Sequence, residues 1–490
     1  MSAFVWTDAL TSVYITDISA WCNIEFEGDG SNPLCKANHL YLNGEEIKDL
    51  IIPKDIKTIK KYCFECCFSL NSVSIPDGIT SIEDYAFRGC KNLTSINIPN
   101  SVTTIGTASF GGCSKIPSVI IPQGVASIGN QAFQNCEQLY SIVFKEGLVN
   151  IGQNAFENCK SLISLNIPNS VTDISYYAFS GCSGLTSVHI SSLEAWCKIS
   201  FKSSSSNPLE YAHHLYLNGE EIKDLVIPTN VKSIRDFTFY GCSGLTSVTI
   251  GNNVTSIRNF TFFGCSGLTS VTIGNSVTSI ADGSFKGCSG LTSVTIPNNV
   301  MSIGIGAFSS CQSLSSIVIE DGVSYIGDNA FEYCTSLTTI ALPNSIFEIR
   351  NSTFYGCSKL TSVIIQNVNF ILGGAFANCQ ELTDFYCYNT NVPFTDPDVF
   401  KDSYIDYATL HVPAVSLDAY KAANPWKNFK EIVALTDDDP KPTGVNTLKA
   451  NHYVYSANTY TIEGKLISNP QRGLNIIRMS DGTTRKVLVK

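Results

Sequence analysis

A repeat of 23 residues constrains this chain more than any other feature. The stretch Leu245–Ile250 reads LTSVTI, and it returns almost unchanged at Leu268–Ile273 and at Leu291–Ile296, each time 23 residues further on. A fixed period of this length indicates that each unit is one supersecondary step, which cannot bury its apolar face alone and must stack on its neighbours. The chain is therefore predicted to form a repeat solenoid, and its function is expected to lie on an extended surface.

A second marker, F-x-x-C-x-x-L, follows the repeat along the chain, with Ile116 in place of the last leucine in one unit. Its cysteines step by 23 residues within each block, except for a last step of 22. They are Cys67, Cys90, Cys113, Cys136, Cys159, Cys182, Cys242, Cys265, Cys288, Cys311, Cys334, Cys357 and Cys379. Equivalent side chains of stacked strands lie about 4.8 Å apart, much further than the roughly 2 Å bond of a disulfide. These cysteines are therefore predicted to be free, buried, small apolar residues.

One unit, for example Leu291–Ser313, predicts three short pieces of structure. Val294 and Ile296 share one face of a first strand, and Ile303 lies in a second, shorter extended segment. The sequence GAFSSC, residues 306–311, predicts a short helical turn that packs its apolar side chains inward. Each rung of about 23 residues thus supplies a strand, a second short strand and a short helical turn.

The array consists of two duplicated blocks, each of which begins with an insert. Residues 17–52 align with residues 192–227, 175 positions later, and His39–Leu50 is identical to its counterpart. The sequences DISAWCNI and SLEAWCKI each suggest a short helix. Asn43-Gly44 and its counterpart in the second block are the strongest kind of short hairpin signal. The inserts are therefore expected to protrude from the array.

Beyond residue 382, where the repeats of residues 1–382 end, the pattern decays. The end of a solenoid needs an atypical unit to cover its exposed core, and residues 383–435 are predicted to form this C-terminal cap. The cap is expected to contain a helix opened by Ser416. The aromatic residues expected to pack from this helix against the core are Tyr420, Trp426 and Phe429.

The last part of the chain has a different composition. Residues 436–444 are charged, contain proline and lack apolar periodicity, which is typical of a linker. Residues 445–490 alternate in the manner of strands and contain Asp481-Gly482, so a small β module of three or four strands is predicted. The three acids Asp437–Asp439 could attract calcium, but adjacent acids in a linker are more often simply solvated.

The charge and hydropathy of the chain exclude two classes of partner. The net charge of −10 and the sequence pI near 5.2 give no basic surface for nucleic acid or for an anionic membrane. No run of apolar residues is long enough for a membrane helix, and Met1–Leu10 lacks the features of a signal peptide. Leu10–Ile15 is already a repeat strand without its preceding F-x-x-C, so an upstream segment that could carry an export signal is expected outside this sequence.

The sequence gives no set of residues that would support catalysis. It has six histidines, no H-E-x-x-H, and no phosphate-binding glycine loop between a strand and a helix. Cys63 and Cys66 form a C-x-x-C pair, but this pair lies in the repeat turn and has no second pair at zinc spacing. No catalytic residue, metal site or cofactor is therefore predicted, and the chain is not expected to be an enzyme.

The residues that point outward from the first strand of each rung are the candidate binding surface. Between the two inward positions, most rungs carry Thr, Ser or Asn, which suit an exposed strand in any case. Ile120 and Val143, with Tyr140 nearby, are apolar instead, and adjacent exposed apolar residues can mark a partner site. The residues proposed for partner binding are Ile120, Val143, Tyr140, Asn97, Asn166 and His189.

The unit IPxxVTSIGxxAFxGCSxLTSVT, as in Ile296–Val318, resembles the BspA-type leucine-rich repeat. The likeness covers about residues 10–435. It implies a right-handed solenoid with a parallel β-sheet, as in surface proteins of anaerobic gut and oral bacteria and of some mucosal protozoa. It also implies cell-surface roles in adhesion to host matrix proteins or to other microbes.

The C-terminal stretch resembles a second family, the sorting domain of the type IX secretion pathway, although it is shorter than the usual domain. The matching residues are Gly464-Lys465, the sequence GLNII from Gly473, and the sequence KVLVK that ends at Lys490. Together the two likenesses imply a secreted or surface-attached bacterial protein.

The leading hypothesis is a non-catalytic surface adhesin or interaction scaffold that binds a host extracellular protein or a microbial surface protein along the solenoid. The alternative is a glycan-binding surface protein, in which Trp21 and Trp196 of the two inserts would form aromatic platforms. The competing interpretation of both tryptophans is core packing, since tryptophan buries a large apolar area.

Overall fold

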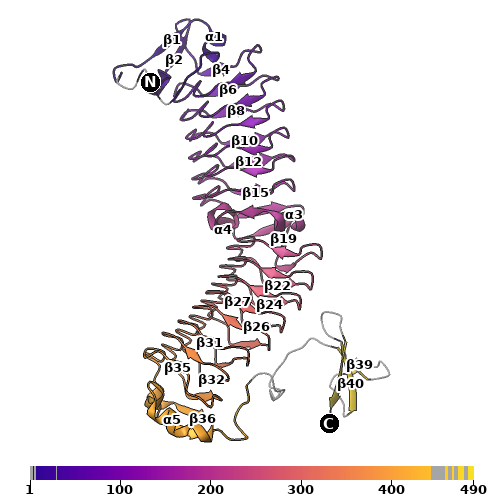
Figure 1. Cartoon of the computed structure of the whole chain (residues 1–490). Helices are drawn as coiled ribbons and strands as arrows, with labels where there is room; N and C mark the ends of the chain where they lie inside the picture. Colours follow the sequence, from indigo (N-terminus) through magenta and orange to yellow (C-terminus); the bar gives the residue numbers. More distant parts are fainter. Residues whose placement is uncertain are drawn as a thin grey trace. The chain divides into compact units, whose positions relative to one another are not determined.

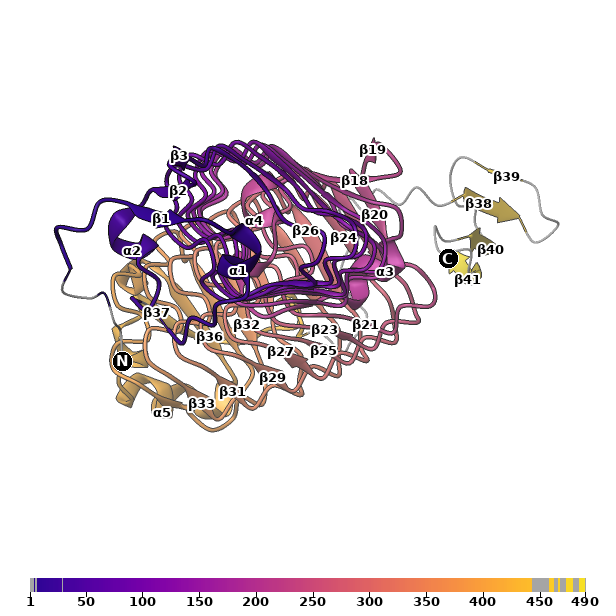
Figure 2. The ribbon, with the colours of Figure 1, turned by 90° about the horizontal axis from the view of Figure 1, so that it is seen from above.

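The computed structural model describes residues 4, 7–28 and 30–442, together with four strands between residues 458 and 489. The chain divides into two compact units, Met1–Gly444 and Val445–Lys490. The first unit is a long stack of coils in which each coil adds one rung (Figure 1). Seen along the stack, successive coils of the first block overlie one another (Figure 2).

The first strand of each rung pairs in parallel with the equivalent strand of the next rung. In one such pair Val248 lies beside Val271 and Thr249 beside Thr272, so every inward residue meets its own equivalent. The strands of this first column are β1 (Val13–Ile15), β2 (Leu40–Leu42), β4 (Asp49–Ile51), β6 (Ser72–Ser74), β8 (Ser95–Asn97), β10 (Ser118–Ile121), β12 (Ser141–Phe144), β14 (Ser164–Asn166), β16 (Ser187–Ile190), β18 (Leu215–Leu217), β20 (Asp224–Val226), β22 (Ser247–Ile250), β24 (Ser270–Ile273), β26 (Ser293–Ile296), β28 (Ser316–Ile319), β30 (Thr339–Ala341), β32 (Ser362–Ile365), β34 (Asp384–Cys387), β36 (Thr409–Val412) and β37 (Glu431–Ala434).

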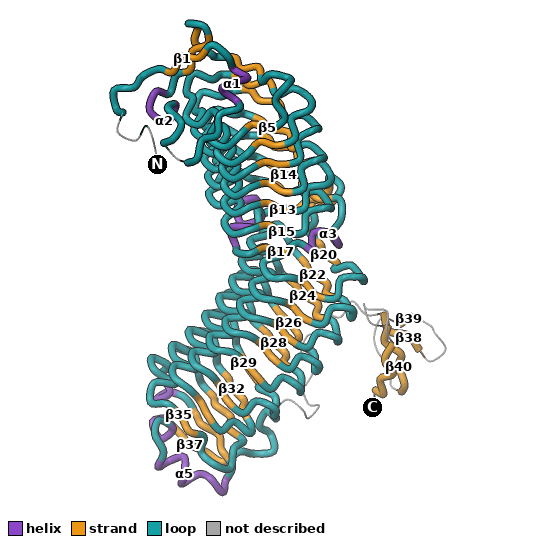
Figure 3. Tube along the Cα trace, turned by 45° about the horizontal axis from the view of Figure 1, so that its top comes forward, coloured by secondary structure: helices purple, strands orange, loops and turns teal. Residues whose placement is uncertain are grey.

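The second, shorter strands form a second parallel column, and Figure 3 shows the strands recurring at the same places in successive coils. They are β5 (Thr58–Ile59), β7 (Ser81–Ile82), β9 (Thr104–Ile105), β11 (Ser127–Ile128), β13 (Asn150–Ile151), β15 (Asp173–Ile174), β17 (Ser200–Phe201), β21 (Ser233–Ile234), β23 (Ser256–Ile257), β25 (Ser279–Ile280), β27 (Ser302–Ile303), β29 (Tyr325–Ile326), β31 (Glu348–Ile349), β33 (Phe370–Ile371) and β35 (Phe394–Thr395). The predicted parallel solenoid with two strands per rung is therefore confirmed.

The core between the two columns is built from stacked equivalents. Val294, Ile296 and Ile303 are buried, as the strand pattern predicts. The marker phenylalanines stack ring on ring, for example Phe262 at 5.3 Å from Phe239 and 5.2 Å from Phe285 between ring centroids. Because each ring is covered on both faces by the same residue of its neighbours, one rung is stable only within the stack.

The predicted short helical turn at residues 306–311 is wrong, because the segment forms β-turns. The amides of Phe308 and Ser310 donate to carbonyls of the next rung, at 2.8 and 2.7 Å, while the amide of Cys311 donates within its own rung to Phe308 at 3.2 Å. Gly306 and Ser310 both have positive φ values, 58° and 62°. A helix would satisfy these amides locally, whereas the stack offers them carbonyls on the neighbouring coil.

The marker cysteines are free and buried, as predicted. Their thiols also make a contact that the sequence does not reveal. The Sγ of Cys288 donates to the carbonyl oxygen of Phe262 on the preceding rung at 3.2 Å, and Cys265 makes the same contact with Phe239. A small apolar residue with a weak S–H donor thus fills this position better than alanine would.

These thiols are expected to be unreactive in the folded protein. Burial raises the pKa of the Cys288 and Cys311 thiols well above the usual value, and only the thiolate is nucleophilic. Titration with Ellman's reagent at pH 8 should therefore leave the marker cysteines unmodified until urea unfolds the chain. Rapid modification of Cys288 in the native protein, read by peptide mass, would contradict this expectation.

The inserts contain the predicted helices and hairpins, yet most of each insert lies within the stack. The helices are α1 (Ile18–Cys22) and α2 (Leu34–Ala37) in the first insert, and α3 (Leu193–Lys198) and α4 (Leu209–Ala212) in the second. The strand β17, which follows α3, pairs with β15 and so continues the second column. The expected protrusion is restricted to the hairpin tips at Asn43-Gly44 and its counterpart, which join β2 to β3 (Glu45–Glu46) and β18 to β19 (Glu220–Glu221).

Residues 383–435 continue the first column with β34, β36 and β37, and place three large aromatic residues at its end. Tyr420, Trp426 and Phe429 are buried, as the cap prediction requires. The helix α5 spans only Leu417–Ala422, so the prediction that all three lie on one helix is wrong. Trp426 belongs to a separate 3-10 turn at Trp426–Asn428, after Pro425, which has no amide hydrogen to continue a helix.

The second unit contains a four-stranded antiparallel sheet in the order β39, β38, β40, β41. The strands are β38 (Asn458–Thr461), β39 (Leu466–Ile467), β40 (Gly473–Arg478) and β41 (Thr484–Val489). The antiparallel pair β40 and β41 flanks the predicted turn at Asp481-Gly482, which itself lies outside the described residues. The resemblance of this stretch to a sorting domain stays a prediction, and Gly464-Lys465 also lies outside the described part.

Candidate protein-interaction surfaces

The apolar residues predicted on the first column lie next to one another. Ile120 on β10 is paired directly with Val143 on β12, and the two are 56% and 38% exposed. Tyr140, just before β12, and Ile163, just before β14, are 52% and 53% exposed on adjacent rungs. We call Ile120, Tyr140, Val143 and Ile163 the first apolar patch. The sequence analysis did not include Ile163, although it occupies the same repeat position as Tyr140.

The three polar residues of the predicted surface flank this patch on the same column. Asn97 lies on β8, and its side-chain amide already bridges to the backbone of Ile75, at 3.1 Å from the Ile75 nitrogen and 3.2 Å from its oxygen. Asn166 on β14 is exposed and paired with His189 on β16. The ring of His189 stacks on Tyr216 at 4.7 Å between centroids. Asn97 therefore helps to hold two rungs together.

The outward stripe is not uniform in the second block. Thr249, Thr272 and Thr295 are exposed, while Ile364 is only 5% exposed. Nearer the cap, Tyr386 stacks on His411 with ring centroids 4.2 Å apart. The stripe thus ends in side chains that are covered by other parts of the chain.

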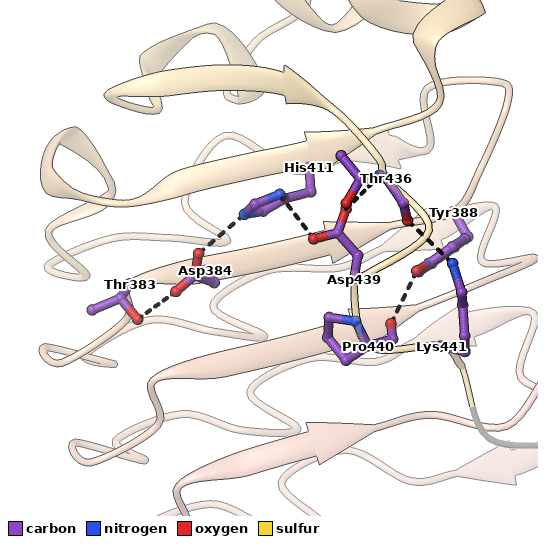
Figure 4. Close-up of polar contacts among 8 residues, drawn as sticks. All are labelled: Thr383, Asp384, Tyr388, His411, Thr436, Asp439, Pro440 and Lys441. Atoms are coloured by element: carbon purple, nitrogen blue, oxygen red, sulfur yellow. Dashed lines mark hydrogen bonds and ion pairs between the residues drawn. The ribbon is translucent and has the colours of Figure 1, made fainter. Parts of the chain in front are cut away.

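The chain itself covers the end of the stripe (Figure 4). The imidazole of His411 lies between the carboxylates of Asp384, at 3.0 Å, and Asp439, at 3.8 Å. The hydroxyl of Tyr388 donates to the carbonyl oxygen of Pro440 at 2.9 Å. Asp439 also accepts hydrogen bonds from the amide and hydroxyl of Thr436 at 2.6 and 3.1 Å. The first part of the predicted linker is therefore packed against the last rungs, and Asp439 is not simply solvated.

A larger apolar surface lies on the second column, where the sequence analysis proposed no site. Phe370 on β33 is 5.6 Å from Phe347 and 6.1 Å from Phe394 between ring centroids, on three successive rungs. These three rings are 41%, 54% and 61% exposed, and Tyr325 and Met301 on the two preceding rungs are 40% and 57% exposed. We call Met301, Tyr325, Phe347, Phe370 and Phe394 the aromatic column.

Charged residues border the aromatic column. The guanidinium of Arg350 lies 5.4 Å from the centroid of the Tyr325 ring. It also pairs with Asp328 at 3.0 Å and with Glu348 at 3.3 Å. An exposed apolar surface with a charged border is typical of a surface that binds another macromolecule.

A sequence signal for the aromatic column exists but requires comparison of rungs. At the first residue of the second short strand, the rungs at Ser256, Ser279 and Ser302 carry serine. The equivalent residues of later rungs are Tyr325, Glu348, Phe370 and Phe394. Replacement of a small polar repeat residue by an aromatic one on an outward position indicates a function other than core packing.

The two insert tryptophans are buried, so they cannot form the aromatic platforms that the glycan hypothesis requires. Trp21 is 5% exposed and Trp196 is 1% exposed. Each indole nitrogen donates to a backbone carbonyl at 3.0 Å, Trp21 to Cys63 and Trp196 to Thr238. Both tryptophans join an insert to the first regular rung that follows it.

The C-x-x-C pair does not act as one unit. Cys63 is buried and its thiol contacts Cys22, whereas Cys66 is half-buried and contacts Cys35. Within the described residues, no three His, Cys, Asp or Glu side chains gather in a way that could hold a metal ion. In the same part of the chain, no helix is long and apolar enough to cross a membrane.

Several solved structures are similar to this chain. A leucine-rich repeat protein from Bacteroides ovatus is 26% identical over 69% of this chain and 86% of its own, with a TM-score of 0.45. A leucine-rich cell surface protein from Faecalibacterium prausnitzii is 24% identical over 72% and 82%, with a TM-score of 0.39. The pneumococcal vaccine antigen PcpA is 15% identical over 81% and 88%, with a TM-score of 0.42. Among curated proteins, none matches this chain significantly.

A family model describes most of the repeat region. The model of the BspA type leucine rich repeat region matches in four overlapping segments, residues 37–161, 105–216, 209–334 and 278–406. These segments contain the phenylalanine stack, the cysteine ladder and both strand columns. The chain belongs to the BspA-type leucine-rich repeat family.

Proposed function

We propose that this chain is a non-catalytic surface protein that binds a protein partner, a host extracellular protein or a microbial surface protein, through the exposed aromatic column. Members of the family are surface proteins, and repeats of this kind typically bind proteins and lack catalytic activity. Attachment of a bacterium to its host or to another microbe would be the consequence of such binding. The secreted or surface location of this chain is part of the proposal.

The aromatic column supports the proposal through its chemistry. Phe347, Phe370 and Phe394 expose apolar area on successive rungs without forming part of the core. Buried aromatic anchors contribute most of the binding energy in many protein interfaces, and a polar border excludes water around them. Arg350 supplies a charged group at the border. A partner that presents an apolar surface of similar length would fit this column.

Restoring the repeat residues should remove binding without disturbing the fold. In the variant Phe347→Thr with Phe370→Ser, each new residue is the one found at the equivalent position of other rungs, such as Thr278 and Ser302. We expect affinity to fall about thirtyfold or more, because loss of a hot spot costs about 2 kcal/mol or more. Binding of the full chain to immobilised host matrix proteins, mucins and microbial surface proteins would measure the change.

A matched variant tests the first apolar patch. Ile120→Thr with Val143→Thr likewise restores the residue of Thr249 and Thr272. If only this variant lost binding, the site would move to the first apolar patch. If both variants bound as the original chain does, both surfaces would be excluded. Displacement by free sugars would revive the glycan hypothesis, and turnover of a bound substrate would argue against a non-catalytic protein.

A further inference from the structure

Two cysteines outside the repeat ladder meet beside the first insert. Cys35 lies in α2 and Cys66 lies in the first F-x-x-C turn, and their thiols are in hydrogen-bond contact. Both residues are half-buried, whereas the flanking Cys63 and Cys67 are buried. A small oxidant can therefore reach the sulfur atoms of Cys35 and Cys66 without opening the core.

The duplicated block shows that this pair is a local addition. The residues 175 positions later are Glu210 and Gly241, so both cysteines are absent together from the second insert. By contrast, the buried Cys22 of the first insert has a cysteine counterpart, Cys197. A Cβ atom built on Gly241 would lie 3.2 Å from the Cα atom of Glu210. The two positions therefore adjoin each other in both copies of the insert.

The surroundings of the pair favour opposite protonation states. The hydrogen bond from Cys35 lowers the pKa of Cys66, and the same contact, followed by burial, raises the pKa of Cys35. The Sγ of Cys35 also donates to the buried carboxylate of Glu65 at 3.2 Å. Glu65 is paired with Arg88 at 3.2 Å. Cys66 is thus the thiol that ionises first and acts as the nucleophile.

Glycine at position 89 leaves space for the Cys66 sulfur. A Cβ atom on Gly89 would lie 3.2 Å from this Sγ, which is closer than most side-chain contacts allow. Cys66 itself has a φ of 58° and its counterpart Gly241 a φ of 73°. The turn therefore keeps the same left-handed backbone in both blocks, and only the first block places a thiol there.

We propose that Cys35 and Cys66 form a reversible disulfide that fastens the first insert to the first repeat turn when the protein meets a small disulfide oxidant. The Cys66 thiolate attacks one sulfur of the oxidant, for example oxidised glutathione, and one glutathione thiolate leaves. Cys35 then loses its proton, and its sulfur attacks Sγ of Cys66 and expels the second glutathione that this attack releases. Two protein thiols are oxidised, and one disulfide is reduced to two thiols.

The disulfide would act on the N-terminal end of the solenoid. It closes a loop between residues 35 and 66 and so links α2 covalently to the stack. Terminal segments are otherwise the first to open in a repeat array. Oxidising surroundings outside the cytoplasm would favour the closed form. This proposal concerns the N-terminal insert and does not depend on the proposed binding surface.

Peptide mapping of the full chain tests the proposal. The protein is equilibrated with excess oxidised glutathione at pH 8, its remaining thiols are alkylated in denaturant, and it is cleaved after glutamate. Cys35 then lies on residues 28–45 and Cys66 on residues 66–83, separate from Cys22 and Cys63. We expect one linked species that is two hydrogen atoms lighter than the two peptides together. Dithiothreitol should separate it, and amide exchange of residues 34–37 should be slower in the oxidised protein.

Two block-matched variants identify the linked atoms. Cys35→Glu and Cys66→Gly each install the residue that the second insert carries, so folding should be retained. With Cys35→Glu, Cys66 should stop at a mixed disulfide with glutathione. With Cys66→Gly, no link between the two peptides should form. Recovery of both cysteines as alkylated thiols in the original chain would overturn the proposal, as would a persistent link through Cys67 in the Cys66→Gly variant.

Discussion

Replacing Phe262 with alanine is expected to lower the free energy of unfolding by about 3 to 5 kcal/mol. The Phe262 side chain is fully buried, and its ring lies between Phe239 and Phe285 at 5.3 and 5.2 Å. Removal of the ring therefore leaves a cavity with an unsupported aromatic face on both sides. Since repeats are stabilised by their neighbours, two rung interfaces are weakened at once.

Urea unfolding followed by circular dichroism measures this change. The matched control is Phe394→Ala, because Phe394 is 61% exposed and its removal leaves no buried cavity. Its free energy of unfolding should change by no more than about 0.5 kcal/mol. Equal shifts for the two variants would show that the stacked rings do not stabilise the solenoid in the way argued above.

Replacing Trp426 with alanine should also cost about 3 to 5 kcal/mol, but its effect should be local. The Trp426 ring is fully buried and meets Phe385, Phe400 and Tyr420 edge to face, with centroids 5.4 to 5.5 Å apart. Its indole nitrogen donates to the hydroxyl of Thr395 at 3.0 Å. Loss of the ring would expose the end of the core, because no regular rung follows it within the first unit.

Hydrogen exchange read by mass spectrometry distinguishes local from global destabilisation. In the Trp426→Ala variant, amides of residues 405–435 should exchange faster, while those of residues 80–180 should keep their protection. Tyr407→Ala is the matched control in the same segment, because Tyr407 is 73% exposed. Uniform acceleration along the whole chain would argue against a capping role for residues 383–435.

The candidate surface could be predicted only in part. An outward position follows directly from alternation along a strand, so Ile120 and Val143 were predictable, and they lie side by side. The aromatic column was missed because its positions hold serine in most rungs and only the later rungs carry Tyr325, Phe370 and Phe394. Large aromatic residues are more often core residues, so exposure has to be observed before they suggest a binding surface.

The sequence by itself determined the solenoid, its period and its core. Each rung pairs with a near copy of itself, so the partner of Val248 or Phe262 is known once the repeat length is known. For this reason the strand faces, the buried cysteines and the duplicated inserts all follow from one period.

Only the tertiary structure decided which chemistry reaches the surface. The repeat turn is not a helix, because carbonyls of the next rung compete for its amides. Trp196 is buried because the following rung covers it and accepts its indole hydrogen through Thr238. Cys35 and Cys66 meet because an irregular insert folds back onto the first turn, and no period predicts such a contact. Contacts between equivalent positions are fixed by periodicity, whereas contacts between unlike segments depend on the path of the chain in space.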